Sequence, residues 1–113
     1  MVQYKWVEEA IWIVMKSKVI VMAKMNNGTK SITSLEVSKR NINQKDLDKF
    51  YERINNKINF NEVQSVRIAL TIINNGNMIY KHSYDAYSKG QLMEFITNLV
   101  MISNYEFHMR YDK

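Results

Sequence analysis

The sequence predicts an α+β fold: an antiparallel sheet of four to five strands built from a duplicated ββα unit, with the helices on one face, plus an N-terminal helix and a C-terminal strand. Two observations carry this prediction. The triplet Asn-Asn-Gly stands at 26–28 and again at 74–76, each time between two apolar runs. Asn-Gly in that setting is the strongest short-range hairpin signal, because both central residues of a type I′ turn need positive φ.

The second observation is that a helical pattern follows each hairpin. It covers about 44–57 after the first hairpin (about 19–37) and 89–101 after the second (about 66–84). The chain is therefore expected to form a single domain, 1–113, with tandem ββα units at about 18–59 and 63–103.

Each predicted helix carries apolar residues at i, i+3, i+4 and i+7, the pattern of an amphipathic helix packed on a core. Each also has a start signal, because Asn43 precedes Asp46 by three residues and Ser88 precedes Gln91 by three, the second being a capping-box pattern. The apolar stripes are Leu47, Phe50, Tyr51 and Ile54 in the first helix and Leu92, Phe95, Ile96 and Leu99 in the second.

The two ends of the chain complete the prediction. Residues 3–16 place apolar side chains on one helical face and favour a helix, although the apolar run 10–15 also fits a strand buried on both faces. Residues 105–111 alternate apolar and polar side chains, which predicts a strand.

The turns also predict which side chains share a face of the sheet. With a two-residue turn at 75–76, Tyr80 pairs with Thr71, His82 with Ala69 and Tyr84 with Arg67; a shift of one residue would exchange the two faces. The predicted core residues of the hairpins are Ile20, Met22, Leu35, Ile68, Leu70, Ile72 and Ile79.

Composition narrows the function classes. The chain has no cysteine and two histidines, so we expect no disulfide, no metal site and no cofactor. The longest apolar run is too short to span a bilayer, which favours a cytoplasmic protein without a membrane partner.

Residues with AT-rich codons dominate, as in genes of phages or mobile elements from AT-rich genomes. Residues 1–57 hold eleven Lys or Arg against six Asp or Glu, whereas residues 58–113 hold five of each.

A basic stripe is the first candidate binding surface. Lys45, Lys49, Arg53 and Lys57 recur at spacings of four on the first predicted helix, directly after Lys39 and Arg40. Such a stripe fits a phosphate backbone or an acidic protein surface. The alternative is an ordinary solvated helix face, since Asp46, Asp48 and Glu52 are interspersed.

The second candidate is an aromatic face. The predicted register gathers Arg67, Tyr80, His82 and Tyr84 away from the helices, where rings stack on bases and a cation holds phosphate. The alternative is that another segment or a second subunit covers these rings.

These features favour a small non-enzymatic binding protein of phage or mobile-element origin. It would inhibit a nucleic-acid-handling host-defence complex, as anti-CRISPR proteins do, an analogy that rests on size and composition alone. The first alternative is a protein that binds single-stranded DNA or RNA directly. The second is a small basic ribonuclease using His82 and His108. The partner is expected to be nucleic acid or an acidic protein surface, and a homodimer is left open.

Overall fold

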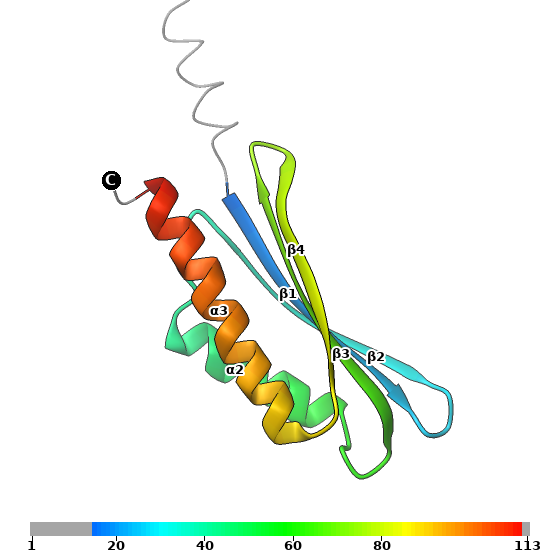
Figure 1. Ribbon diagram of the computed structural model, residues 1–113. Helices are drawn as coiled ribbons and strands as arrows, with labels where there is room; N and C mark the ends of the chain where they lie inside the picture. Colours follow the sequence, from blue (N-terminus) through cyan, green and yellow to red (C-terminus); the bar gives the residue numbers. More distant parts are fainter. Residues whose placement is uncertain (1–14, 112–113) are drawn as a thin grey trace, which may run out of the picture.

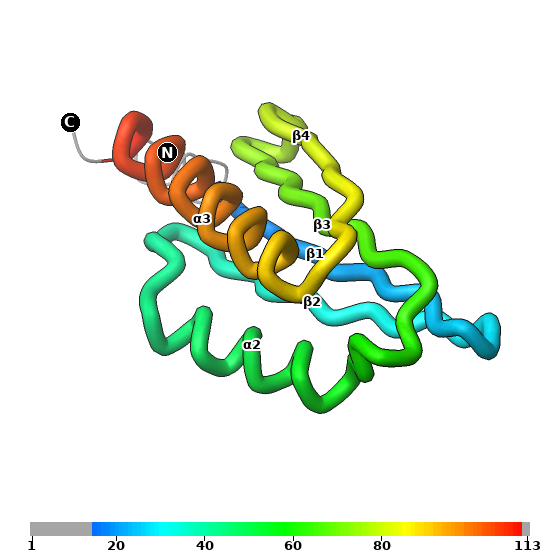
Figure 2. Tube along the Cα trace, turned by 60° about the horizontal axis from the view of Figure 1, so that its bottom comes forward, coloured from blue at the N-terminus to red at the C-terminus, as the bar shows by residue number. Residues whose placement is uncertain are grey.

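Six elements follow one another in the order ββαββα in the computed structural model, which describes residues 15–111 (Figure 1). The strands form one antiparallel sheet with the order β2-β1-β3-β4, and both helices lie on one face of it (Figures 1 and 2). The elements are β1 (Met15–Met25), β2 (Lys30–Ser38), α2 (Gln44–Lys57), β3 (Val63–Asn74), β4 (Asn77–Ala86) and α3 (Lys89–Tyr111).

The predicted α+β class, with a four-strand antiparallel sheet and helices on one face, is confirmed. A common origin of the two ββα halves stays a prediction. Most of the predicted N-terminal helix lies outside the described residues, and its last two positions, Met15 and Lys16, are the start of β1.

The two Asn-Asn-Gly triplets form different turns. Asn75 (φ 54°) and Gly76 (φ 79°) both have positive φ and join Asn74 directly to Asn77, as the predicted type I′ turn requires. In the first triplet Gly28 has positive φ (90°), and its N–H donates to Met25 O (2.9 Å). Lys24 pairs with Lys30 there, so five residues form the loop and the register differs by one from that of a two-residue turn.

That difference fixes the faces of β1. Val19 and Val21 are fully buried under the helices, opposite Leu70 and Ile68 of β3. The prediction that Ile20 and Met22 belong to the core is therefore wrong, because the one-residue change in register turns both side chains to the other face of the sheet. Leu35 of β2 is buried as predicted.

The second hairpin contains a β-bulge that the sequence did not reveal. Between Ile72 and Ile73 the register shifts, and Ile79 is the extra residue on β4. Beyond the bulge the pairs are Ile72 with Tyr80, Leu70 with His82 and Ile68 with Tyr84, while Arg67 pairs with Asp85. The buried positions of Ile68, Leu70 and Ile72 are confirmed, but Ile79 is 36% exposed and the predicted core role is wrong.

Both helices begin where their capping signals indicate. The Asn43 side chain accepts from Asp46 N–H (2.9 Å), and the Asp46 carboxylate accepts from Asn43 N–H (2.9 Å), which closes a capping box. Ser88 Oγ likewise accepts from Gln91 N–H (3.0 Å) at the start of α3. Phe50 and Ile54 of α2 and three α3 residues, Leu92, Ile96 and Leu99, are buried completely.

The C-terminal segment is a continuation of α3, so the predicted strand over 105–111 is wrong. The alternation of apolar residues there also suits a helix, because Ser103, Phe107 and Tyr111 recur every four residues on one face. Ser103 Oγ donates to Ser17 Oγ of β1 (2.6 Å), the Phe107 and Tyr111 rings stack, and no glycine or proline interrupts residues 91–111. The helix therefore runs along the sheet to Tyr111 (Figure 1).

The capping box of α2 makes a pH-dependent contribution to stability. The hydrogen bond from Arg40 lowers the pKa of the Asp46 carboxyl below its usual value of 3.8, and the Asn43 N–H acts in the same direction. Because the folded pKa is lower than the unfolded one, this stabilisation is present above pH 3.8 and is lost as pH falls through the folded pKa. We expect Asp46→Asn to lower the free energy of unfolding by about 1 kcal/mol at neutral pH. Urea unfolding should show this difference shrinking at pH 3, and a difference that stays constant with pH would contradict the assignment.

Candidate functional site

Within residues 15–111, one face of the sheet is not covered by a helix, and that face is basic. It lies opposite α2 and α3, and we refer to it as the open face. Six cationic side chains project from it against two carboxylates, Glu36 and Asp85, with exposed apolar residues between them. The cations are Lys16, Lys18 and Lys24 of β1, Lys30 of β2, Arg67 of β3 and Lys81 of β4; the exposed apolar residues include Met22, Ile32 and Met78, and the half-buried Ile20 lies beside them.

Two of these cations are placed directly opposite each other. Lys24 and Lys30 are cross-strand partners at the end of the β1–β2 hairpin. Like charges at such a position destabilise a sheet, because their Cβ atoms lie about 5 Å apart. An anion bound between them would relieve this repulsion.

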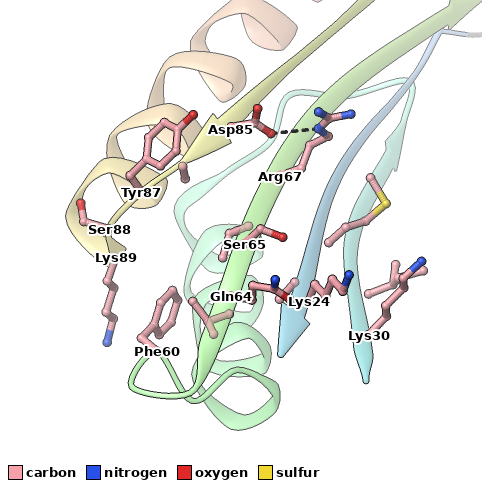
Figure 3. Close-up of a pocket in the computed structure, with 16 residues that line it drawn as sticks. Lys24, Lys30, Phe60, Gln64, Ser65, Arg67, Asp85, Tyr87, Ser88 and Lys89 are labelled. Carbon is pink, nitrogen blue, oxygen red and sulfur yellow. Dashed lines mark hydrogen bonds and ion pairs between the residues drawn. The ribbon is translucent and has the colours of Figure 1, made fainter. Parts of the chain in front are cut away.

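The open face continues into a groove at this end of the sheet (Figure 3). The groove has a volume of about 650 Å³, which is in the range of small-molecule and nucleotide sites. Its lining includes four cations, Lys24, Lys30, Arg67 and Lys89, and two aromatic rings, Phe60 and Tyr87.

The aromatic rings give the groove surfaces on which a planar ligand can stack. Tyr87 is 85% exposed, so its ring contributes little to the core. The Lys89 ammonium lies 5.6 Å from the centre of the Phe60 ring, a cation–π contact that keeps this charge beside the groove.

Arg67 is held in a defined orientation by its neighbour on β4. Its Nε donates to Asp85 Oδ1 (3.0 Å), and this hydrogen bond raises the pKa of the guanidinium above its usual value. Both side chains are more than half exposed, so the ion pair contributes little to stability. Its effect is to orient the guanidinium, whose terminal amino groups are the donors that bind phosphate in a bidentate manner.

The predicted basic stripe on α2 is only partly available for binding. Arg53 Nη2 donates to Ser34 O (2.8 Å) and Lys57 Nζ donates to Ile32 O (3.2 Å), so both side chains bond the edge strand β2. An edge strand presents carbonyls without a strand partner, and these contacts satisfy two of them. Lys45 and Lys49 are exposed on the helix.

The two residues predicted beside that stripe have structural contacts of their own. Arg40 binds the Asp46 carboxylate, with Nη2 2.9 Å from Oδ1. Lys39 has positive φ (61°), and its N–H donates to Met15 O (3.0 Å). This hydrogen bond joins the residue after β2 to the first residue of β1.

The predicted aromatic row faces the helices, and the prediction that it lies away from them is wrong. The bulge at Ile79 turns Tyr80, His82 and Tyr84 to the side of α3, where Tyr84 stacks on Phe95 at 5.0 Å between ring centroids. Burial raises the pKa of Tyr80 above its usual value, with smaller contributions from Tyr84 and Glu106 of α3. Arg67, on the opposite face, does not share a surface with these rings.

Sequence reasoning missed most of the open face. Lys16, Lys18 and Lys24 are separated by even numbers of residues, which places them on one side of a strand once β1 is known to begin at Met15. The pattern of residues 3–16 hides that start, because it favours a helix that includes Met15 and Lys16. Phe60 and Tyr87 lie next to element ends, where no periodic pattern indicates their direction.

Within residues 15–111, no group of three or more acidic, histidine or cysteine side chains could hold a metal ion. The helices of that same part of the chain are too short or too polar to cross a membrane. Comparisons with protein-family models, with curated proteins and with solved structures find no match to this chain.

Proposed function

We propose that this chain is a non-enzymatic protein that binds single-stranded nucleic acid through its open face. The observation that carries the proposal is the groove at the end of this face, where four cations and two aromatic rings line a volume of about 650 Å³. Phosphates supply the negative charge that the cations require, and bases supply flat apolar surfaces for the rings.

The chemistry of the face favours a single strand over a duplex. Exposed apolar side chains such as Met22, Ile32 and Met78 lie among the cations, and unstacked bases are the part of a nucleic acid that such groups contact. Lysine outnumbers arginine on the face, which favours contacts with the phosphate backbone over bidentate recognition of base edges. Binding with little sequence preference is expected.

An inhibitor encoded by a phage or mobile element, acting in the host cytoplasm on a nucleic-acid-handling complex, would use the same face against an acidic protein surface. The dominance of residues with AT-rich codons supports that origin. The repeated ββα order supports descent of the two halves by duplication. The groove favours nucleic acid over protein because its two rings, above all the exposed ring of Tyr87, suit bases. A protein partner is therefore the alternative outcome of the test below.

The test is a fluorescence-anisotropy titration of a labelled single-stranded oligonucleotide of mixed sequence, with the matching duplex in parallel. We expect the single strand to bind more tightly. Its affinity should fall with salt at a log–log slope of about −2 to −4, since each phosphate neutralised on a single strand contributes about −0.7. Absence of binding to DNA and RNA at low salt would reject the proposal and leave an acidic protein surface as the ligand of this face.

Tyr87 provides a test of base stacking in the groove. Tyr87→Ala is expected to weaken single-strand binding about tenfold, because stacking of one base on an aromatic ring contributes about 1–3 kcal/mol. Tyr87→Phe keeps the ring and should bind as the unaltered protein does. Thermal unfolding should be nearly unchanged in both, since the side chain is 85% exposed. Equal affinity of the alanine and phenylalanine variants would exclude stacking at this position.

A further inference from the structure

Helix α3 has an apolar outer surface that no other part of residues 15–111 covers. Met101, Tyr105 and Met109 are exposed by 65%, 61% and 48%, and they point away from the sheet-facing residues Ile96 and Ser103. A helix with apolar residues on all sides is normally covered on all sides. We refer to Met101, Tyr105 and Met109 as the α3 ridge.

We propose that the α3 ridge binds the same ridge of a second copy of this chain, forming a two-fold symmetric dimer. The sequence of the ridge reads the same in both directions, methionine, tyrosine, methionine, at a constant spacing of four residues. A two-fold axis through Tyr105 would place Met101 of each copy against Met109 of the other and the two Tyr105 rings against each other, so every contact along the ridge joins apolar groups, as a self-complementary interface requires.

The spacing also defines a packing geometry. Residues at i, i+4 and i+8 form one of the natural ridges of a helix, and two such ridges interdigitate when the helices cross at about −50°, the commonest class of helix packing. The flexible methionines can adapt to the tyrosine rings of the partner, because thioethers pack well against aromatic edges.

The charges of α3 balance, whereas the rest of the surface is positive and would repel a second copy. The whole chain has a formal charge of +5, so two copies repel each other over most approaches. Within α3 the two basic residues, Lys89 and Arg110, are balanced by Glu94 and Glu106, and Arg110 bonds Glu106 within the helix (3.4 Å). The ridge is therefore a surface on which two copies meet without net repulsion.

The arrangement has a consequence for binding. Since α3 covers the face of the sheet opposite the open face, pairing through the α3 ridge leaves both open faces exposed and directed away from each other. The dimer would present two separate binding surfaces. The proposal itself does not depend on what those surfaces bind.

Sedimentation velocity over a concentration series, without nucleic acid, tests the dimer. The weight-average mass of the unaltered full chain should rise from 13.5 kDa toward twice that value, with little dependence on salt. Tyr105→Glu and Tyr105→Lys should each stay at the monomer mass, because a charge on the two-fold axis faces its own copy. An equimolar mixture of the two variants should associate, since the charges are then opposite.

Asn55→Glu, an exposed change on α2, serves as the matched control and should dimerise normally. Three results would overturn the proposal. A monomer at every concentration would mean that residues 1–14 or a different protein cover the ridge. Dimerisation of Tyr105→Glu alone would mean that another surface is used. Failure of the mixed variants to associate, although each is folded by circular dichroism, would exclude the two-fold axis at Tyr105.

Discussion

Replacing Lys24 and Lys81 together by glutamate is expected to weaken the binding of single-stranded DNA about 100-fold at low salt. The double change removes two phosphate contacts from the open face and adds two repulsions, and each lost contact also reduces the salt dependence by about 0.7 in log–log slope. Lys24 borders the groove and Lys81 lies on β4 across Thr71, so the two changes act at separate parts of the face. Anisotropy titrations at several salt concentrations measure both quantities.

Lys24→Glu is expected to weaken binding without lowering the stability of the fold. Glutamate at this position faces Lys30 across the strands and replaces a repulsive pair with an attractive one, so the free energy of unfolding should not fall. The control is Lys45→Glu with Lys49→Glu on the exposed face of α2, which alters the net charge by the same amount. If the α2 control loses as much affinity as the open-face variant, binding follows net charge or the helix stripe, and the open face is not the site.

Phe50→Ala is expected to lower the free energy of unfolding by about 3–5 kcal/mol, more than Asp46→Asn does. Among residues 15–111, Phe50 is the largest side chain that is completely buried. It packs α2 against the sheet, with the Arg53 guanidinium 5.7 Å from its ring centre. Small domains are stable by only about 5–15 kcal/mol, so this loss would leave a marginal fold. Equilibrium urea unfolding by circular dichroism measures it.

Glu52→Ala, two residues away and exposed, should change stability by less than about 0.5 kcal/mol. A loss below about 1 kcal/mol for Phe50→Ala would mean that α2 does not pack on the sheet as described.

Elements with local signals were predictable from the sequence. The start of α2 follows from the spacing of Asn43 and Asp46, and the turn at Asn75 and Gly76 follows from the need for positive φ. The buried stripes of both helices follow from their 3.6-residue period. Each of these features depends on residues a few positions apart, which is why local patterns sufficed.

The faces of the sheet were not predictable in the same way. They depend on one extra residue at Ile79 and on a five-residue loop at the first triplet, and both change the register by one position. Apolar residues occur on both faces of β1 and β4, so alternation alone does not reveal which face is covered. For this reason the predicted site residues Tyr80, His82 and Tyr84 lie on the helix side, and of the six cations of the open face the sequence indicated Arg67 alone.

The structure of the last part of α3, residues 105–111, was not predictable from local patterns either. Residues 105–111 alternate in polarity, and only contacts with distant parts of the chain decide between strand and helix. Ser103 bonds Ser17, and Asn104 Oδ1 accepts from Ile42 N–H (2.8 Å), which holds the helix against the sheet and the loop before α2. These partners are 86 and 62 residues away in sequence.

Mapping of amide chemical shifts by NMR, during titration with a short single-stranded oligonucleotide, tests the open face as the binding site most directly. We expect the shifted amides to cluster at Lys24, Lys30, Arg67, Tyr87 and the start of α3 at Lys89, extending along β1 toward Lys16, while α2 and the rest of α3 stay unchanged. Shifts confined to Lys45 and Lys49 on α2, or to the Tyr80–Tyr84 side of β4, would contradict the account and return the site to the surfaces that the sequence alone predicted.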